Sequence, residues 1–167
     1  MDDNNVSFRV HKDDLSDAVA WVARNLPTKN TQPVLRAVVI TADDTGLELA
    51  GFDYEVSTRV RISAEVAEPG RVAVAGKLMA DIVSNMPAKP VEVSVDNSRL
   101  LLQGGSARFE LPLMPLDDYP VLPELPEVTG TLDTSTFVNA VTQVASAAGR
   151  DDTLPVSYTH LTLPTNR

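Results

Sequence analysis

The side chains best suited to chemistry are three pairs of adjacent carboxylates and one histidine. The pairs are Asp43-Asp44, Asp117-Asp118 and Asp151-Asp152, and the histidine is His11. Paired carboxylates can share general acid and general base work. Each pair, however, lies in a predicted turn, where Asp is favoured for its local backbone hydrogen bonds. We therefore expect these carboxylates to have structural roles.

Other catalytic and cofactor patterns are not recognisable in the sequence. His11 is the one histidine outside the segment 157–167, so neither a His-based metal site nor a His general base has a supporting partner. The chain contains no cysteine, which removes thiolate chemistry, disulfides and Cys-based zinc sites. Gly-rich phosphate loops and nucleophile elbows are not seen, and Gly104-Gly105 suits a hairpin turn. The sequence predicts no catalytic residue, no metal site and no cofactor.

Composition places the chain among globular proteins. Its 167 residues are 43% hydrophobic and carry a formal net charge of −9, which argues against indiscriminate binding of nucleic acid by the whole surface. A local surface lined with basic residues is still compatible with a negative net charge. The first residues, Met1 to Asn5, do not resemble a secretory signal, and no apolar run approaches the roughly 20 residues of a membrane span. We expect a cytoplasmic protein with no membrane partner.

The chain repeats its own beginning. Residues 6–34 align on residues 128–156 without a gap, and eight aligned pairs are identical. These pairs are Val6/Val128, Ala18/Ala140, Val19/Val141, Val22/Val144, Ala23/Ala145, Thr31/Thr153, Pro33/Pro155 and Val34/Val156. A constant offset over this length indicates tandem copies of one domain of about 120 residues.

Hydrophobic periodicity predicts an α+β fold in which two helices back a mainly antiparallel sheet. Apolar residues at helical spacing indicate helices over 13–26 and 76–86, each followed by proline. Strands are expected over the following ranges: 6–10, 35–41, 47–50, 54–66, 71–75, 91–95, 99–103 and 107–111. Residues 112–126 are rich in proline and are predicted to be a connector.

Four segments follow from the repeat and the connector. We expect a first domain at 1–122, a Pro-rich connector at 123–127 and the truncated start of a second domain at 128–156. After Val156 the similarity to the first copy ends inside a structural element, so residues 157–167 are predicted to be a non-native tail, similar to translated cloning sequence. A short natural tail is the alternative.

Several segments, in one order, resemble the N-terminal domain of the bacterial DNA polymerase III β subunit, the sliding-clamp family. They are Thr31–Leu35, Gly51–Glu55, Gly76–Val83, Met86-Pro87, Ala107–Leu111 and Met114–Pro120. The resemblance covers residues 6–156. It implies a processivity-fold domain, three of which form each subunit, and two subunits close head to tail into a ring around duplex DNA.

The resemblance implies a DNA-facing surface that contains Arg24, Lys29 and Lys77. Arg24 lies opposite the apolar stripe of the first helix and would face the hole of the ring. Lys29 and Lys77 would take similar inward positions. Asp13 and Asp17 share that helix surface and dilute the attraction to phosphates. An ordinary solvated helix face is the alternative.

The resemblance also implies a subunit interface along the strand 107–111. Arg108 would supply charge, while Phe109 and Leu111 would supply apolar contact with a second clamp subunit. Alternatively, Phe109 belongs to the core, since aromatic residues favour both settings. In the family, the replicative polymerase and clamp loader bind a cleft between later domains, so we expect that cleft to be missing from this chain.

The function predicted from the resemblance is a fragment of a non-catalytic DNA-replication processivity factor. The ring would bind double-stranded DNA without reading its sequence and would tether the polymerase. One alternative is a β-rich protein-interaction module with no DNA role. A carbohydrate or nucleotide hydrolase that uses the Asp pairs is a third alternative.

Overall fold

The computed structural model describes residues 5–27, 32–124 and 126–146. The chain divides into two compact units, Met1–Pro123 and Glu124–Arg167, which are considered separately below. The division falls next to the domain boundary predicted after residue 122.

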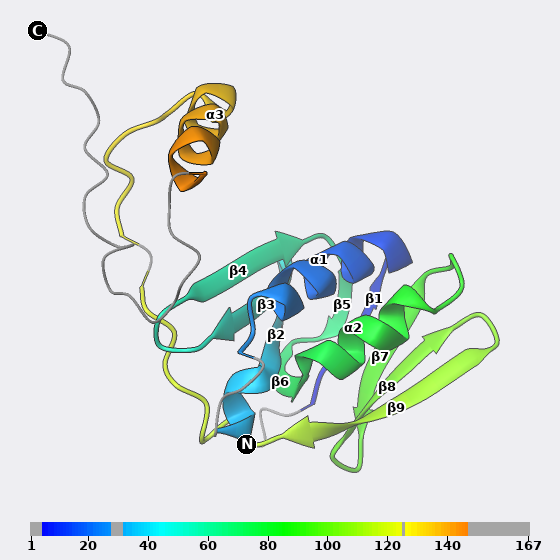
Figure 1. The fold of residues 1–167 in the computed structure, drawn as a ribbon. Helices are drawn as coiled ribbons and strands as arrows, with labels where there is room; N and C mark the ends of the chain where they lie inside the picture. Colours follow the sequence, from blue (N-terminus) through cyan, green and yellow to red (C-terminus); the bar gives the residue numbers. More distant parts are fainter. Residues whose placement is uncertain (1–4, 28–31, 125, 147–167) are drawn as a thin grey trace, which may run out of the picture. The chain divides into compact units, whose positions relative to one another are not determined.

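The described residues of the first unit form nine strands and two α-helices (Figure 1). In chain order the elements are β1 (Ser7–Val10), α1 (Lys12–Arg24), the short 3-10 helix η1 (Pro33–Arg36), β2 (Ala37–Asp43), β3 (Gly46–Phe52), β4 (Ser57–Ile62), β5 (Glu65–Glu68), β6 (Gly70–Ala75), α2 (Gly76–Ser84), β7 (Val91–Asp96), β8 (Arg99–Gly104) and β9 (Ala107–Met114). The two helices and the antiparallel sheet confirm the predicted fold class.

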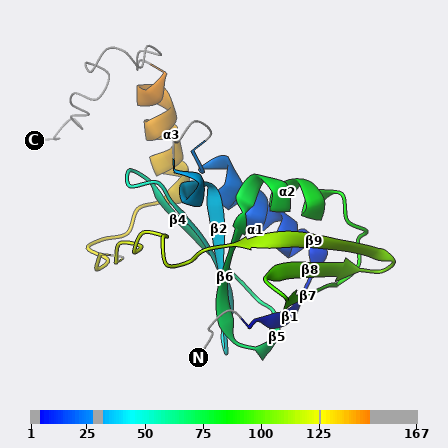
Figure 2. The ribbon, with the colours of Figure 1, turned by 90° about the horizontal axis from the view of Figure 1, so that it is seen from below.

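All neighbouring strands of the sheet are antiparallel, in the order β4-β3-β2-β6-β9-β8-β7-β1-β5. Strands β4, β3, β2 and β6 form what we call the β2 half, and β9, β8, β7, β1 and β5 form the β7 half. The halves join at two residue pairs, Ala73 with Met114 and Val74 with Leu113. Figure 2 shows both helices on one face of the sheet.

The helices form because their apolar residues recur on one side and find the sheet beneath them. Leu15, Val19 and Val22 of α1 are fully buried, while Asp13 and Asp14 are exposed in its first turn, where the helix dipole favours negative charge. In α2, Met79 and Val83 are fully buried. The inner face of both helices therefore follows directly from the apolar spacing.

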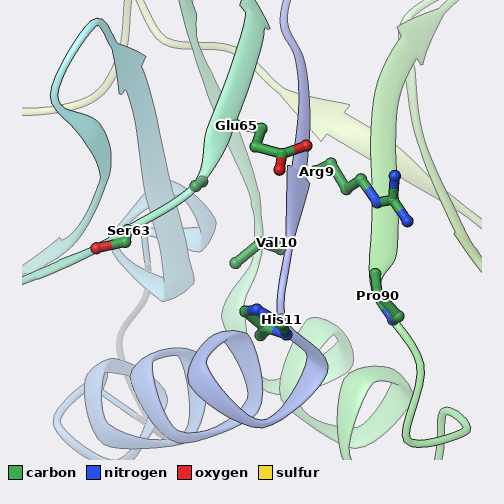
Figure 3. A pocket seen from close by; sticks show the side chains of 7 residues that line it. Arg9, Val10, His11, Ser63, Glu65 and Pro90 are labelled. Carbon is green, nitrogen blue, oxygen red and sulfur yellow. The ribbon is translucent and has the colours of Figure 1, made fainter.

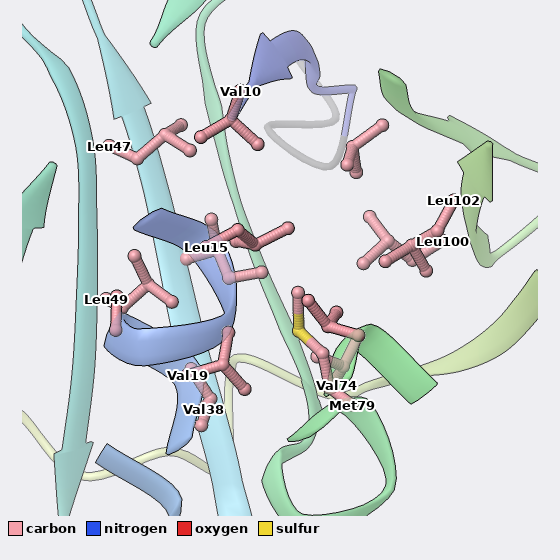
Figure 4. Close-up of a cluster of buried hydrophobic side chains, with 14 of the residues drawn as sticks. Val10, Leu15, Val19, Val38, Leu47, Leu49, Val74, Met79, Leu100 and Leu102 are labelled. Carbon is pink, nitrogen blue, oxygen red and sulfur yellow. The ribbon is translucent and has the colours of Figure 1, made fainter. Parts of the chain in front are cut away.

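One core spans the two halves of the sheet (Figure 4). Leu15 and Met79 enter it from the helices, Leu49 from the β2 half, and Leu100 and Leu102 from the β7 half. All five side chains are completely buried. Burial of such side chains contributes about 1.5–3 kcal/mol each, so the helix layer also holds together two half-sheets that share few strand contacts.

The outer face of the β2 half is covered by residues 115–123, which we call the strap. Tyr119 packs there against Ala37, Val39 and Ala73 and is only 7% exposed. The outer face of the β7 half instead carries exposed polar side chains, such as Arg9, Glu92, Gln103 and Arg108. In the β2 half, the sheet therefore lies between two other layers: the helices on one face and the strap on the other.

Three predicted element boundaries were wrong. Residues 54–66 form two strands, because β4 pairs with β3 whereas β5 crosses to pair with β1. Residues 33–36 form η1 before β2 begins, with proline in its first turn. Strand β9 continues through Pro112 to Met114. The amide of Leu113 donates to the carbonyl of Ser98, the residue just before β8, so Pro112, whose backbone faces the other way, loses no hydrogen bond to β8.

The second unit contributes one described helix, α3 (Thr134–Ala145). The carboxylate of Asp133 accepts hydrogen bonds from the amide of Thr136 and the hydroxyl of Ser135, which caps its N-terminus. No residue of α3 is buried, and Phe137 and Val141 are 53% and 47% exposed. This helix keeps the apolar stripe predicted by the repeat.

Candidate functional site

Arg24 and Lys77 lie at the same end of the helix layer. Arg24 is in the last turn of α1 and Lys77 is in the first turn of α2, and both are exposed. Leu26, just beyond α1, packs so closely on Gly76 that a side chain at Gly76 would collide with it. The structure therefore brings these two predicted cations to neighbouring helix ends, although they are distant in sequence.

The guanidinium of Arg24 is only partly committed to the protein. Its Nε donates to the carbonyl of Ala20 at 3.3 Å, one turn back in α1. Asn25 makes a similar contact, with Nδ2 at 2.8 Å from the carbonyl of Trp21. The bond to Trp21 satisfies one of the last four carbonyls of α1, which lack a partner within the helix. The exposed guanidinium of Arg24 thus stays near the C-terminal end of α1. A positive charge is favourable there, because the helix dipole has its negative end at the C-terminus.

The other end of the α1 surface is acidic. Asp13, Asp14 and Asp17 are exposed there, and Lys12 Nζ lies 3.6 Å from Asp13 Oδ1. Any anion-binding role is therefore confined to the Arg24 and Lys77 end. Lys29, the third predicted cation, lies outside the residues that the structure describes.

A second candidate surface is the open edge of β9. Residues 107–112 pair with β8 on one side, and β9 pairs with β6 only at Leu113 and Met114. Because the Leu113 amide points to β8, the backbone groups of Arg108 and Glu110 point to the open side. An edge of this kind can accept another strand, and Pro112 limits its length.

The side chains beside this edge form an ion-pair cluster. Glu110 lies between two arginines, with Oε2 at 3.1 Å from Arg99 Nη1 and Oε1 at 4.0 Å from Arg108 Nη2. Both arginine side chains are 62% exposed. Exposed ion pairs contribute only about 0–1 kcal/mol, so Arg108 can exchange Glu110 for another carboxylate at little cost.

The two apolar residues predicted at this edge differ in their surroundings. Phe109 is partly buried and packs against the main core, which leaves part of its ring accessible. Leu111 is fully buried within the same core. Since its side chain has no exposed surface in this chain, Leu111 can act on a partner only by supporting its neighbours from beneath.

A shallow hollow of about 460 Å³ lies where β1 leads into α1 (Figure 3). Its polar lining comes from Arg9, His11, Ser63 and Glu65. The side chains of Ser63 and Arg9 point to opposite sides of the hollow, so this lining does not pair a nucleophile with a base. Within the described ranges, no group of three or more His, Asp or Glu side chains is arranged to hold a metal ion.

The two Asp pairs that the structure describes lie in different elements, each in a local turn or loop setting. Asp43 binds Thr45 and Arg61 at the β2–β3 turn, and the Thr45 hydroxyl is the main cause that lowers its pKa. Asp117 and Asp118 are exposed in the strap. The pair at 151–152 lies beyond the part of the chain that the structure describes.

Comparison with known protein families shows which family has this fold. The family model "DNA polymerase III beta subunit, N-terminal domain" matches residues 6–123, from the start of β1 to the end of the strap. The chain belongs to this family. The matched range coincides with the first unit, so the strap is part of the family domain.

Relatives and solved structures agree with this assignment. The chain is 50% identical over 151 residues to the beta sliding clamp of Streptomyces coelicolor and 46% identical to that of Micrococcus luteus. These alignments take in 90% of this chain but only 40% and 49% of the two relatives. The crystal structure of the DNA polymerase sliding clamp from Bacillus subtilis superposes with a TM-score of 0.84 at 26% identity. That superposition covers 91% of this chain and 43% of the clamp.

Two features of the site were not foreseen from the sequence. Glu110 emerges as the partner of Arg99 and Arg108 only once the β8–β9 register is known. Tyr119 was placed in a connector because of the surrounding prolines, yet burial raises the pKa of its hydroxyl, opposed by the nearby Phe52 backbone and Arg71. The apolar spacing of Leu116, Tyr119 and Leu122 was the available signal for the strap.

As for membranes, none of the helices in the described ranges has the length and apolarity to cross a bilayer.

Proposed function

We propose that this chain forms the N-terminal part of a replication processivity factor, a ring that encircles duplex DNA in the cytoplasm and catalyses no reaction. The family match over residues 6–123 carries the proposal. Partners of the whole protein are double-stranded DNA, a second clamp subunit, the replicative polymerase and the clamp loader. The last two bind a cleft formed by domains that follow those in this chain.

The proposed DNA-facing surface is the end of the helix layer that holds Arg24 and Lys77, together with Lys29. Positive charges attract the phosphate backbone and release its counterions, which requires no contact with base edges. The acidic residues Asp13, Asp14 and Asp17 keep this attraction local. A weak and local attraction suits a protein that must hold DNA and still slide along it.

The proposed subunit interface is the open edge of β9. The backbone of residues 108 and 110 would pair with a strand of the partner, which extends the sheet across the ring. Arg108 would pair with an acidic side chain of that strand, and the accessible part of Phe109 would make apolar contact. Leu111, buried beneath, would hold Phe109 in place.

The DNA-facing assignment is tested in a full-length clamp that carries residues 6–123 of this chain. Reversal of charge at Arg24, Lys29 and Lys77 should reduce retention on circular DNA at low salt, for any DNA sequence. The defect should shrink as salt screens all the contacts. Arg24→Gln should also reduce retention. Arg9→Gln is its matched control: it too removes one exposed arginine, but in β1, and should leave retention unchanged. Unchanged retention of the triple variant at low salt would refute this surface.

The interface is tested by Phe109→Asp in the same full-length clamp. This change should lower the stability of the dimer in the absence of DNA, as measured by sedimentation at decreasing concentration. Because Phe109 also packs against the core, urea unfolding must show that the domain is still folded. A ring that dissociates no more readily, in a folded variant, would exclude Phe109 from the interface. A protein that binds partners but is never retained on closed circular DNA would favour the rival interaction module.

A further inference from the structure

Strand β9 ends in the middle of the sheet, whereas the first unit ends at one of its edges. Met114, the last residue of β9, pairs with Ala73 of β6 at the joint between the two halves. Pro123, the last residue of the unit, accepts a hydrogen bond from Arg59 of β4, the outermost strand of the β2 half. Between these points the strap passes over β6, β2 and β3.

The middle of the strap is fixed by Tyr119. The outer residues of β2 and β6 beneath it are small, Ala37, Val39 and Ala73, and this leaves a bed into which the Tyr119 ring fits. A turn with a hydrogen bond of 3.0 Å from the Tyr119 amide to the Leu116 carbonyl points the ring inward. Leu116 and Leu122 pack at the two sides of the same cluster. Most of the buried apolar surface of the strap therefore depends on one ring.

The end of the strap is fixed by Arg59. Its Nη2 donates to the carbonyl of Pro123 at 2.6 Å. Charged donors make short and strong hydrogen bonds, and this one joins residues that are far apart in sequence. Val121 between the two anchors is 91% exposed, so the strap is held at separate points and not along its whole length.

We propose that the strap is a latch that moves the exit of the chain from the joint of the sheet to its β4 edge, with Tyr119 and Arg59 as positioning residues. If the latch were released, the chain would leave the unit at Met114, and whatever follows Pro123 would lose its fixed starting point. The latch depends only on contacts within the first unit. It would stand even if the proposed DNA role failed.

The hydroxyl and the ring of Tyr119 have separable effects. The hydroxyl is buried, and in the described part of the chain no group meets it with the geometry of a full hydrogen bond, although the Phe52 backbone lies near enough to oppose the rise in its pKa. An unpaired buried hydroxyl does not stabilise the docked state, so the ring alone should hold the strap. Tyr119→Phe should therefore leave the latch closed, and Tyr119→Ala should open it.

The absence of cysteine allows a direct measurement on the 167-residue chain. Gln103→Cys on β8 and Val121→Cys in the strap place two spin labels at exposed positions of the first unit. Double electron–electron resonance measures the distance between the two labels. It should give one narrow distance distribution in the doubly labelled chain and in the same chain with Tyr119→Phe. The narrow peak should be lost in Tyr119→Ala and weakened in Arg59→Gln. Trp21→Ala removes a partly exposed aromatic ring of α1, on the face of the sheet opposite the strap, and should keep the peak.

A narrow, unchanged peak in both Tyr119→Ala and Arg59→Gln would overturn the latch, as would a broad distribution in the labelled parent chain. Circular dichroism shows whether each variant is folded. If Tyr119→Ala does not fold, Arg59→Gln decides alone, because it removes a bond at the surface and leaves the apolar bed intact. Loss of the peak in Trp21→Ala would also count against the proposal, since the effect would then not be specific to the strap.

Discussion

Helices α1 and α3 occupy corresponding places in the two copies of the repeat, and they are stabilised in different ways. In α1 the residues Leu15, Val19 and Val22 are completely buried, and no side chain caps the N-terminus at His11. In α3 the corresponding stripe begins with Phe137 and is exposed, while Asp133 caps the N-terminus. Burial holds one helix, and local hydrogen bonds hold the other.

This difference shows what an apolar stripe does and does not determine. The stripe sets which side of a helix will be buried if a sheet is present. It does not supply the sheet, which for α1 is built from residues 37–114 and from β1. An amphipathic helix of twelve residues is marginal in water without such a partner, so local capping becomes important for α3.

The largest contrast is expected from core truncation. Leu15→Ala should destabilise the first unit by about 2–5 kcal/mol, because it removes a fully buried side chain and leaves a cavity. Phe137→Ala at the matched position should change the same transition by less than about 0.5 kcal/mol, since the ring is exposed. Urea unfolding followed by fluorescence of Trp21, the one tryptophan, measures both. Equal losses would show that α3 contributes to the core.

A second contrast is expected in amide hydrogen exchange. Amides of α1 should open only with global unfolding of the first unit, whereas amides of α3 should exchange through local fraying. Exchange followed by mass spectrometry resolves the two helices without any mutation. Comparable protection would mean that the apolar stripe of α3 has found a covering surface.

A third contrast concerns pH. Hydrogen bonds from Ser135 and Thr136 lower the pKa of Asp133 to about 2, below its usual 3.8. The cap stabilises α3 fully above pH 3.8 and is lost as the pH falls through about 2. A peptide of residues 132–146 should therefore lose helix content over that range by circular dichroism. Asp133→Ala should start with lower helix content and lack this acid transition; an unchanged transition in that variant would assign it to another group.

The smallest effect is expected from a new cap on α1. His11 has an extended backbone at the N-cap, but its side chain accepts no hydrogen bond from the amides of the first turn. His11→Ser should add such a bond and stabilise the first unit by roughly 0.5–1 kcal/mol. A shift of the urea midpoint to higher concentration would support this. No shift would indicate that burial alone already fixes the first turn.

Periodicity predicted the elements whose neighbours in sequence are also their neighbours in space. The helices over 76–84 and 12–24 and the three-strand meander from β7 to β9 belong to this group. The break between β4 and β5 could not be predicted, because alternation continues through residues 57–68 while the pairing partner changes from β3 to β1. The alternation of apolar and polar residues along a strand does not depend on which distant strand it pairs with, so it cannot identify that partner.

The candidate site was predictable to a similar extent. The helical wheel gave the exposure of Arg24, but only the fold brings Lys77 beside the end of α1. For β9, the prediction placed Arg108, Phe109 and Leu111 together at the interface, whereas the structure exposes Arg108 and turns Phe109 and Leu111 inward. Alternation cannot tell that Phe109 lies at the margin of the core and Leu111 at its centre. That distinction depends on where β9 sits in the sheet.

The pairing of β1 with β7 has a consequence for synthesis on the ribosome. Val10 pairs with Val91, so the first strand to leave the ribosome must wait for one of the last before it has that neighbour. Early in that interval, before β2, β3 and β4 have emerged, the apolar stripe of α1 has no sheet to cover it, much as the stripe of α3 is exposed in this structure. Vectorial synthesis therefore exposes a nascent apolar helix until β2 to β4 and α2 have emerged, and chaperones that shield such surfaces would act on this stretch.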